Sequence, residues 1–147
     1  MNVTLRRATQ LDEDLIFYWR NLPEIYNLGK EKRPVGKDEH HKWYQKVIES
    51  NHDLFFIITF SDIDCGVIRY NYLSGKTWEV SIYIAEKHSS GIGTEALNIS
   101  FLFLPKDSEI IACILPENSR GVAFFNRNKF EKMQSQDFTL IKMLRKI

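Results

Sequence analysis

Two glycines, Gly91 and Gly93, stand one residue apart in the stretch AEKHSSGIGTEALN at residues 85–98. Small polar residues precede them, and a run with helical character follows. The first N–H groups of a helix lack partners within it and coincide with the positive end of the helix dipole. A glycine lets an anion approach those groups without a Cβ atom in its path. The segment predicts either a phosphate-binding loop or an ordinary glycine-containing start of a helix.

Other features of this segment narrow the kind of phosphate it would hold. Ser89, Ser90 and Thr94 can add hydroxyl donors to an anion bound there. A Walker loop is excluded, because no Lys-Ser/Thr pair follows at the required spacing. The segment also fits a dinucleotide fingerprint poorly, since the third glycine is missing and the first strand is far away.

A second side chain that could take part in a reaction is Glu79, in the strand-like stretch TWEVSIYIA. Strand alternation predicts two faces, with Trp78, Val80, Ile82 and Ile84 on one and Glu79, Ser81 and Tyr83 on the other. A carboxylate at this place can act as a general base, either directly or through a water molecule. A carboxylate on an exposed sheet face would merely be solvated, and this interpretation stays open.

The elements that must position these groups alternate along the chain without a linker. Hydrophobic periodicity and turn residues predict the order β-α-α-β-β-β-α-β-α-β-β. The expected elements are a strand at Val3–Arg7, a helix from Asp12 that Pro23 ends or bends, a helix from Asp38, strands at LFFIITF, CGVIRYNYL and 78–85, a helix at 91–104, a strand at 109–114, a helix at Asn118–Asn128 and two short final strands. One sheet would serve the whole chain, so we expect a single domain over residues 1–147 of the α/β (α+β) class.

Composition and charge exclude several classes of protein. With 44% apolar and 27% charged residues and a net charge of +1, the chain of 147 residues is typical of a globular protein and has no basic field that would attract nucleic acid or a membrane. The two cysteines, Cys65 and Cys113, lack metal-ligand spacing, so we expect reduced, buried thiols and no metal. The first residues show no apolar signal segment, which favours a cytoplasmic location.

Two motifs and the order of elements resemble one known superfamily. The stretch IYIAEKHSSGIGTEAL resembles the acyl-CoA-binding motif of the GNAT N-acetyltransferases, whose pattern Arg/Gln-x-x-Gly-x-Gly/Ala falls on residues 88–93. ENSRGVAFFNRNKF, at residues 117–130, resembles the family's segment that ends in Tyr-x-x-x-Gly-Phe. DLIFYWRNLPEI and DEHHKWYQKV resemble one branch, the bacterial amino-sugar N-acetyltransferases such as those of the pseudaminic acid pathway. The resemblance spans nearly the whole chain and implies a single central mixed, mostly antiparallel sheet with helices on both faces.

The resemblance implies acetyl-CoA as co-substrate and a set of residues that hold it. Pantetheine amides would pair with the backbone of the strand around Tyr83, and the pyrophosphate would lie on the amides of residues 89–94. The cofactor-binding candidates are Ile82, Ile84, His88, Ser89, Ser90, Gly91, Ile92, Gly93, Thr94, Asn118 and Phe125. The chain departs from the motif at two positions, where His88 replaces Arg or Gln and Ser89 replaces a glycine.

The catalytic candidates are Glu79 as base, which matches an acidic residue on this strand in related enzymes, and Tyr83 as a substitute for the family's acid. The family commonly places a tyrosine hydroxyl near the sulfur of CoA, and Phe125 stands at that position here. A phenyl ring donates no proton, so Tyr83 or a water molecule would have to take that role. Asn118 would contact CoA or cap its helix, and capping alone would explain its presence.

The acceptor would be bound by the first two helices, the loop at residues 28–37 and the third strand. The candidates are Trp19, Arg20, His41, Trp43, Arg69 and Tyr70. Aromatic planes with a few polar groups suit a sugar nucleotide. At helical spacing, however, Trp19 and Trp43 also fit the core, and Arg20 fits the surface.

These observations predict an N-acetyltransferase that moves acetyl directly from acetyl-CoA to a primary amine, most simply that of a nucleotide-linked amino sugar. A protein N-terminus or a polyamine is the alternative acceptor. A non-catalytic acyl-CoA-binding protein is a third reading, supported by Phe125 and His88. A homodimer is left open.

Overall fold

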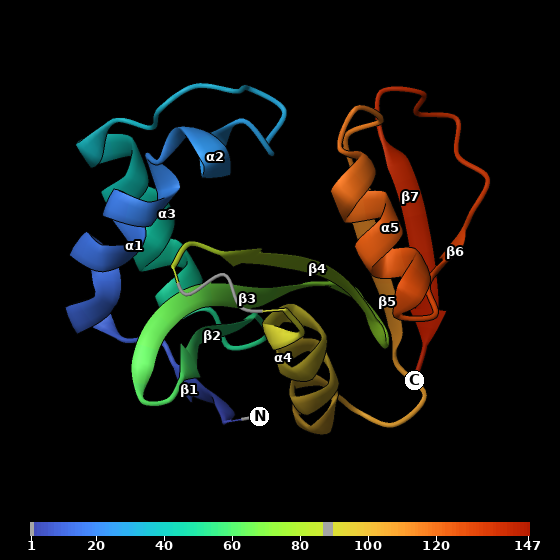
Figure 1. Ribbon diagram of the computed structural model, residues 1–147, viewed down its shortest axis with the longest axis horizontal. Coiled ribbons are helices and arrows are strands. Elements are labelled where there is room, and N and C mark those ends of the chain that lie inside the picture. Colours follow the sequence, from blue (N-terminus) through green and yellow to red (C-terminus); the bar gives the residue numbers. More distant parts are fainter. Residues whose placement is uncertain (1, 87–89) are drawn as a thin grey trace.

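A computed structural model describes residues 2–86 and 90–147. Its seven strands form one sheet in the order β1-β2-β3-β4-β5-β7-β6 (Figure 1). The strands are β1 (Val3–Arg7), β2 (Leu54–Phe60), β3 (Ile63–Ser74), β4 (Thr77–Ile84), β5 (Glu109–Ile114), β6 (Glu131–Lys132) and β7 (Ile141–Lys146). Neighbouring strands pair antiparallel except β4 and β5, which pair in parallel. The predicted mixed, mostly antiparallel sheet is confirmed.

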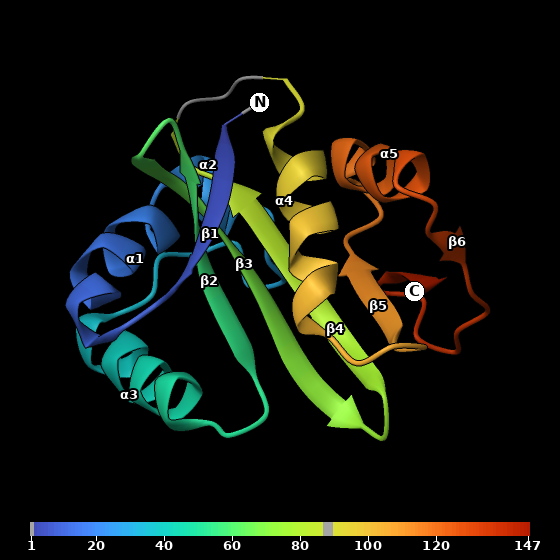
Figure 2. The ribbon, with the colours of Figure 1, turned by 90° about the horizontal axis from the view of Figure 1, so that it is seen from below.

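Helices cover both faces of the sheet, as predicted (Figure 2). They are α1 (Glu13–Arg20), α2 (Pro23–Tyr26), α3 (Lys37–Glu49), α4 (Ile92–Ser100) and α5 (Ser119–Arg127). Helices α1 and α3 pack on one face, and α4 and α5 pack on the other. In the part of the chain that the structure describes, no helix is long and apolar enough to cross a membrane.

Two expected elements differ from the structure. Pro23 does not end the first helix, which stops at Arg20; instead it begins the short helix α2, because a proline at the first helical position loses no hydrogen bond. The helix expected over 91–104 is shorter, since α4 ends at Ser100 and a single 3-10 turn, Phe101–Phe103, follows before Pro105.

Alternation along β4 decides which side chains reach which face. Trp78 and Val80 are buried in the core beneath α4 and α5, and Ile82 and Ile84 pack against the same core. Tyr83 instead packs against the core beneath α1 and α3. The two faces predicted for this strand are therefore confirmed, and Glu79 and Ser81 share the α1/α3 face with Tyr83.

The end of α5 adopts a Schellman motif, in which a left-handed residue closes the helix. The Phe130 N–H donates to the Phe125 carbonyl at 2.9 Å, and the Lys129 N–H donates to Asn126 at 3.2 Å. The rings of Phe125 and Phe130 pack edge to face with centroids 5.0 Å apart. Lys129 has φ of 68°, a conformation that glycine adopts at no steric cost.

Replacing Lys129 with glycine should therefore raise the melting temperature. Left-handed backbone costs a residue with a Cβ atom about 1 kcal/mol, which corresponds to roughly 3 °C in a chain of this size. Differential scanning calorimetry measures the shift. Lys129→Ala keeps the Cβ atom at the same φ and is the matched control, so a gain of equal size in both variants would contradict the explanation.

Candidate active site

The parallel strands β4 and β5 separate after a short stretch of pairing. Their register runs from Thr77↔Glu109 to Val80↔Ala112 and does not extend to the end of β4. The Lys76 carbonyl accepts from Glu109 of β5 at 2.7 Å, whereas the Ala85 N–H donates to Cys65 on the β3 side at 2.7 Å. Because backbone groups alternate between the two sides of a strand, Ile82 and Ile84 direct their N–H and C=O groups toward the β5 side. Within the described residues, no strand pairs with them there.

The start of α4 lies at the same edge of the sheet. β4 ends at Ile84, α4 begins at Ile92, and β5 follows α4 in a crossover (Figure 1). Gly91 precedes the helix with φ of 92°, a conformation open to glycine but strained for other residues. The N–H groups of Ile92, Gly93 and Thr94 lie in the first turn, where no helical carbonyl is available to them.

Gly93 has a packing role that its spacing did not suggest. A Cβ atom at this position would lie 3.0 Å from the ring of Phe124 on α5. The absence of a side chain at Gly93 therefore lets α4 and α5 pack closely. This contact does not test the predicted role of Gly93 toward phosphate, which stays a prediction.

Two of the hydroxyl and imidazole candidates cannot be placed. His88 and Ser89 lie outside the described residues, so their predicted roles stay predictions. Ser90 is exposed just before the helix. The Thr94 hydroxyl accepts from Asn128 Nδ2 at 3.2 Å, which leaves its own proton free to donate.

Two candidates from α5 have structural roles. Asn118 caps the helix, because its Oδ1 accepts from the Gly121 N–H at 3.0 Å. Phe125 is buried against Phe124 and Phe130 in the core, where it closes the end of the helix. Neither contact tests a role toward CoA, and a phenyl ring supplies no proton in either case.

The catalytic candidates lie on one face of β4. Glu79 is half-buried and lies opposite Asn71 of β3 and Ile111 of β5. Its pair with Ile111 is the last but one before β4 and β5 separate. Tyr83 packs edge to face with Trp19, and burial raises its pKa above the usual value, an effect that the cationic Arg20 and Arg69 oppose. Tyr83 therefore keeps its proton at neutral pH, as an acid must.

Trp43 and Arg69 come together from α3 and β3. The Arg69 guanidinium carbon lies 5.4 Å from the centroid of the Trp43 ring. Both side chains line a pocket of about 490 Å³ between α3 and the sheet. This pair forms the part of the predicted acceptor site that the structure assembles.

Other predicted acceptor residues do not lie with that pair. Tyr70 is completely buried on the opposite face of the sheet, where its hydroxyl lies 2.6 Å from Ser100 Oγ of α4, because it is adjacent to Arg69 in the strand and points the other way. Trp19 is also completely buried, and its Nε1–H donates to Glu86 at 2.9 Å. His41 lies on the outer surface of α3 and donates from Nδ1 to Glu13 of α1 at 2.7 Å. Arg20 is half-buried at the end of α1.

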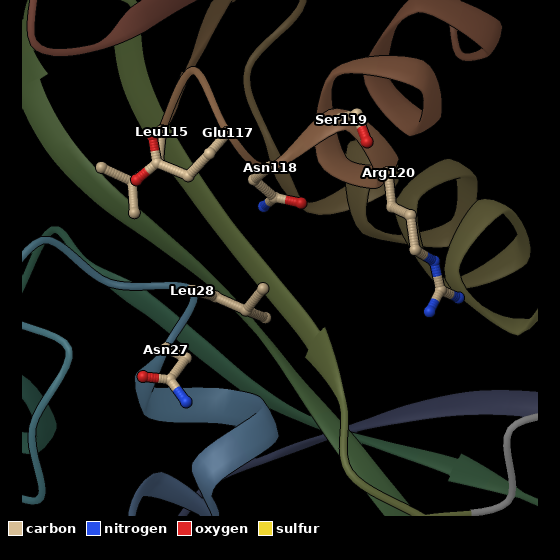
Figure 3. Close-up of a pocket in the computed structure, with 7 residues that line it drawn as sticks. All are labelled: Asn27, Leu28, Leu115, Glu117, Asn118, Ser119 and Arg120. Atoms are coloured by element: carbon tan, nitrogen blue, oxygen red, sulfur yellow. The ribbon is translucent and has the colours of Figure 1, made fainter.

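A second hollow lies between the segment after α2 and the segment that joins β5 to α5 (Figure 3). It measures about 270 Å³ and is lined by Asn27 and Leu28 after α2 and, from the end of β5 to the first turn of α5, by Leu115, Glu117, Asn118, Ser119 and Arg120. The Lys32 ammonium lies 2.6 Å from Glu117, which joins the loop after α2 to the start of α5. This hollow opens at the carboxyl end of β5, the edge at which β4 and β5 have separated.

The structure adds residues that the sequence reasoning missed. Lys46 and Asn71 line the larger pocket beside Trp43 and Arg69. Lys46 follows Trp43 by three residues on a helix, and Asn71 follows Arg69 by two on a strand, so each shares a face with its predicted neighbour. This spacing is the feature of the sequence from which both residues could have been predicted. Glu86, the partner of Trp19, had no comparable signal because the contact joins segments far apart in the sequence.

Comparison with known proteins agrees with this geometry. The model of the acetyltransferase (GNAT) domain matches residues 2–131. The chain therefore belongs to the GNAT acetyltransferase family and is an acyltransferase. A relative named acetyltransferase PseH, from Campylobacter jejuni strain 81-176, is 25% identical over 134 residues, which cover 87% of this chain and 84% of that protein.

Solved structures show the same fold at lower identity. A domain from Methanocaldococcus jannaschii superposes with a TM-score of 0.86 at 21% identity over 99% of both chains. The aminoglycoside acetyltransferase AAC(6')-Ib in complex with coenzyme A gives 0.82 at 17% identity over 99% of this chain and 95% of that one. The N-acetyltransferase PseH of Campylobacter jejuni gives 0.72 at 16% identity over 99% of both.

Gly66 on β3 allows the end of β4 to lie where it does. A Cβ atom at this position would lie 2.3 Å from the Tyr83 carbonyl oxygen and 3.0 Å from the Ile84 Cα atom. We therefore expect Gly66→Ala to push β4 outward and to lower the free energy of unfolding by about 1–3 kcal/mol. Urea denaturation measures the loss, and hydrogen exchange should show faster exchange of the amides at residues 82–84.

Gly29→Ala is the matched control for this change. A Cβ atom at Gly29 would make an ordinary contact of 3.5 Å with the Tyr26 carbonyl oxygen. Its effect should stay within about 0.5 kcal/mol. Equal losses in the two variants would contradict a specific role for Gly66.

Proposed function

We propose that this protein transfers an acetyl group directly from acetyl-CoA to a primary amine, most simply that of a nucleotide-linked amino sugar. The observation that carries the proposal is the early separation of β4 from β5. It leaves the backbone groups of Ile82 and Ile84 facing the β5 side without a strand partner among the described residues. Pantetheine is an extended chain with amide groups, and such a chain can pair with a strand edge as another strand would.

The start of α4 would hold the pyrophosphate of the co-substrate. The N–H groups of residues 92–94 and the helix dipole suit a doubly charged anion. Gly91 provides the left-handed turn that brings the chain into the helix. His88 and Ser89, which precede this turn in the sequence, are proposed to contribute through a ring N–H and a hydroxyl group.

Glu79 is proposed as the base that takes a proton from the amine, directly or through water. It shares a sheet face with Tyr83, and the last pair of β4 with β5, Val80↔Ala112, lies between the two residues along the strand. Tyr83 is proposed to protonate the departing thiolate, because its hydroxyl carries a proton at neutral pH; burial raises its pKa and so makes it a weaker acid than a free tyrosine. A backbone N–H of β4 would polarise the thioester carbonyl.

Charge at the smaller hollow supports an anionic acceptor. Arg120 lines it, and the loop after α2 adds the exposed cations Lys30, Lys32 and Arg33. Lys32 and Arg33 have carboxylate partners, whereas Lys30 and Arg120 have none within 4.0 Å among the described residues. Free cations at a mouth repel a polyamine and attract an anionic ligand as it approaches.

The resemblance of the first two helices to amino-sugar N-acetyltransferases supports an amino sugar as the acceptor class, and the relative named acetyltransferase PseH aligns with 87% of this chain. The expectation of an acyl-CoA-binding protein without catalysis is not retained, because the chain belongs to an acyltransferase family. Phe125 still leaves the usual position of the acid without a proton donor, so the proposed acid is Tyr83 or a water molecule.

Acetyl-CoA should raise the melting temperature of the native protein in a thermal-shift titration. At a ligand concentration of a hundred dissociation constants, binding stabilises the folded state by about 2.7 kcal/mol. Gly91→Trp places a side chain at the start of α4 and should abolish the shift. No shift at millimolar acetyl-CoA would overturn the proposed function. Gly75→Trp, at an open turn far along the sheet, is the control for the substitution itself and should leave the shift intact.

Glu79→Gln should lower kcat about 100-fold or more on any amine that the native protein acetylates, because general base catalysis contributes at least that factor. The affinity for acetyl-CoA should not change, since the proposed base contacts the amine. Glu109→Gln removes an exposed carboxylate from the adjacent strand and is the matched control. Steady-state kinetics measure both, and a loss that disappears at high pH would support the role of a base.

A further inference from the structure

The larger pocket contains an arginine that has no carboxylate partner among the residues the structure describes. The pocket holds about 490 Å³ and lies between the second half of α3 and strand β3. The residues that matter for its chemistry are Trp43, Lys46, Ser50, Asp53, Arg69 and Asn71. They come from α3, the turn that follows it, and β3.

Arg69 is the least satisfied charge in this pocket. Its guanidinium group has five N–H donors. The described residues offer it Ser81 Oγ at 3.5 Å and the face of the Trp43 ring at 5.4 Å. No carboxylate of the described chain lies within 4.0 Å of it. Burial lowers the pKa of Arg69, while the more distant Glu79 and Asp53 oppose that effect. A guanidinium group removed from water in this way is stabilised by an anion.

The other charges of the pocket leave a positive balance. Asp53 is the carboxylate among the lining residues, and its Oδ1 already accepts from the Tyr72 N–H at 2.8 Å. The Ser50 hydroxyl accepts from the N–H groups of residues 52 and 53. Lys46 is exposed at the rim and has no carboxylate within 4.0 Å among the residues described. Two cations therefore face one carboxylate whose lone pairs are partly used.

The position of the pocket connects it with the proposed transfer centre. Arg69 lies opposite Ser81 of β4 in the sheet register, and Asn71 lies opposite Glu79. Adjacent strands are about 4.8 Å apart, so the pocket begins one strand away from the proposed base. A molecule that presents its amine at Glu79 can therefore extend across β3 on the same sheet face and reach Arg69.

We propose that this pocket binds the diphosphate of the acceptor, with Arg69 and Lys46 as its cationic contacts and Trp43 as its apolar wall. The assignment rests on the proposed function, because it takes the amine to be placed at Glu79. It makes Arg69 a specificity-determining residue, since a neutral or cationic amine would leave its guanidinium group without a partner. The site thereby selects nucleotide-linked amines over aminoglycosides and polyamines.

The test uses UDP as a probe and isothermal titration calorimetry on the full chain. Arg69→Met removes the charge and keeps a side chain long enough to pack on Trp43. It should weaken UDP binding by about tenfold or more, as expected for loss of a charge-assisted hydrogen bond. Lys46→Met should weaken UDP binding less, because Lys46 is exposed. Lys42→Met removes a cation from the same helix outside the pocket and should change nothing.

Further titrations distinguish binding of the diphosphate group from binding of the base or of free phosphate. Uridine, which lacks phosphates, should bind far more weakly than UDP, and Arg69→Lys should restore part of the affinity if the charge is what matters. Pyrophosphate that binds as tightly as UDP would mark a site for free phosphate and overturn the assignment to the acceptor. Equal UDP affinity in the native protein and Arg69→Met, or no UDP binding to the native protein at millimolar concentration, would also overturn it.

A separate titration with acetyl-CoA keeps the two proposals distinguishable. Acetyl-CoA should stabilise the native protein and Arg69→Met equally, because Arg69 is not among the groups proposed to hold CoA. A native protein that responds to acetyl-CoA but binds UDP independently of Arg69 would retain the proposed function and lose this inference. A native protein that binds UDP through Arg69 without any response to acetyl-CoA would lose the proposed function instead.

Discussion

The parallel pairing of β4 with β5 ends after four residue pairs, and the rest of the site depends on this early end. Unpaired backbone N–H and C=O groups away from water are costly, so a strand edge inside a sheet needs a partner. β4 continues to Ile84, beyond the last pair at Val80↔Ala112. A chain of amides is the ligand that such an edge accepts best, and an acyl-CoA contains one.

Close backbone approaches hold this edge in place. Gly66 allows the carbonyl of Tyr83 to lie where a Cβ atom would otherwise be, and Ala85 and Glu86 both donate to the Cys65 carbonyl just beyond the strand. Gly93 lets Phe124 of α5 pack directly on α4. Gly66 and Gly93 thus position the strand and the helix at the proposed cofactor site because they allow close packing. Gly91 is needed there for its left-handed backbone conformation.

The two faces of the sheet differ in the side chains that they carry. The face beneath α4 and α5 is a closed apolar core that contains Tyr70 and Phe125. The face beneath α1 and α3 also has an apolar core, but charged and polar side chains reach the sheet there, among them Arg69, Glu79 and Tyr83. This difference between the faces follows from strand alternation, which places the side chains of adjacent residues on opposite faces. It places the proposed base and the proposed diphosphate contact on one surface.

The sequence by itself determined the order of the elements, the central sheet and the two faces of β4, because these follow from local periodicity and turn residues. It also indicated the glycine segment, Trp43 and Arg69 among the candidate site residues, and the resemblance to the GNAT family. Only the tertiary structure decided that Tyr70 points away from Arg69's pocket, that Gly93 faces Phe124, and that Trp19 contacts Glu86. Each of these depends on which segments far apart in the chain lie together, and no local pattern carries that information. The point at which β4 leaves β5 is of the same kind, since it depends on how two strands pair that the helix α4 separates in the chain.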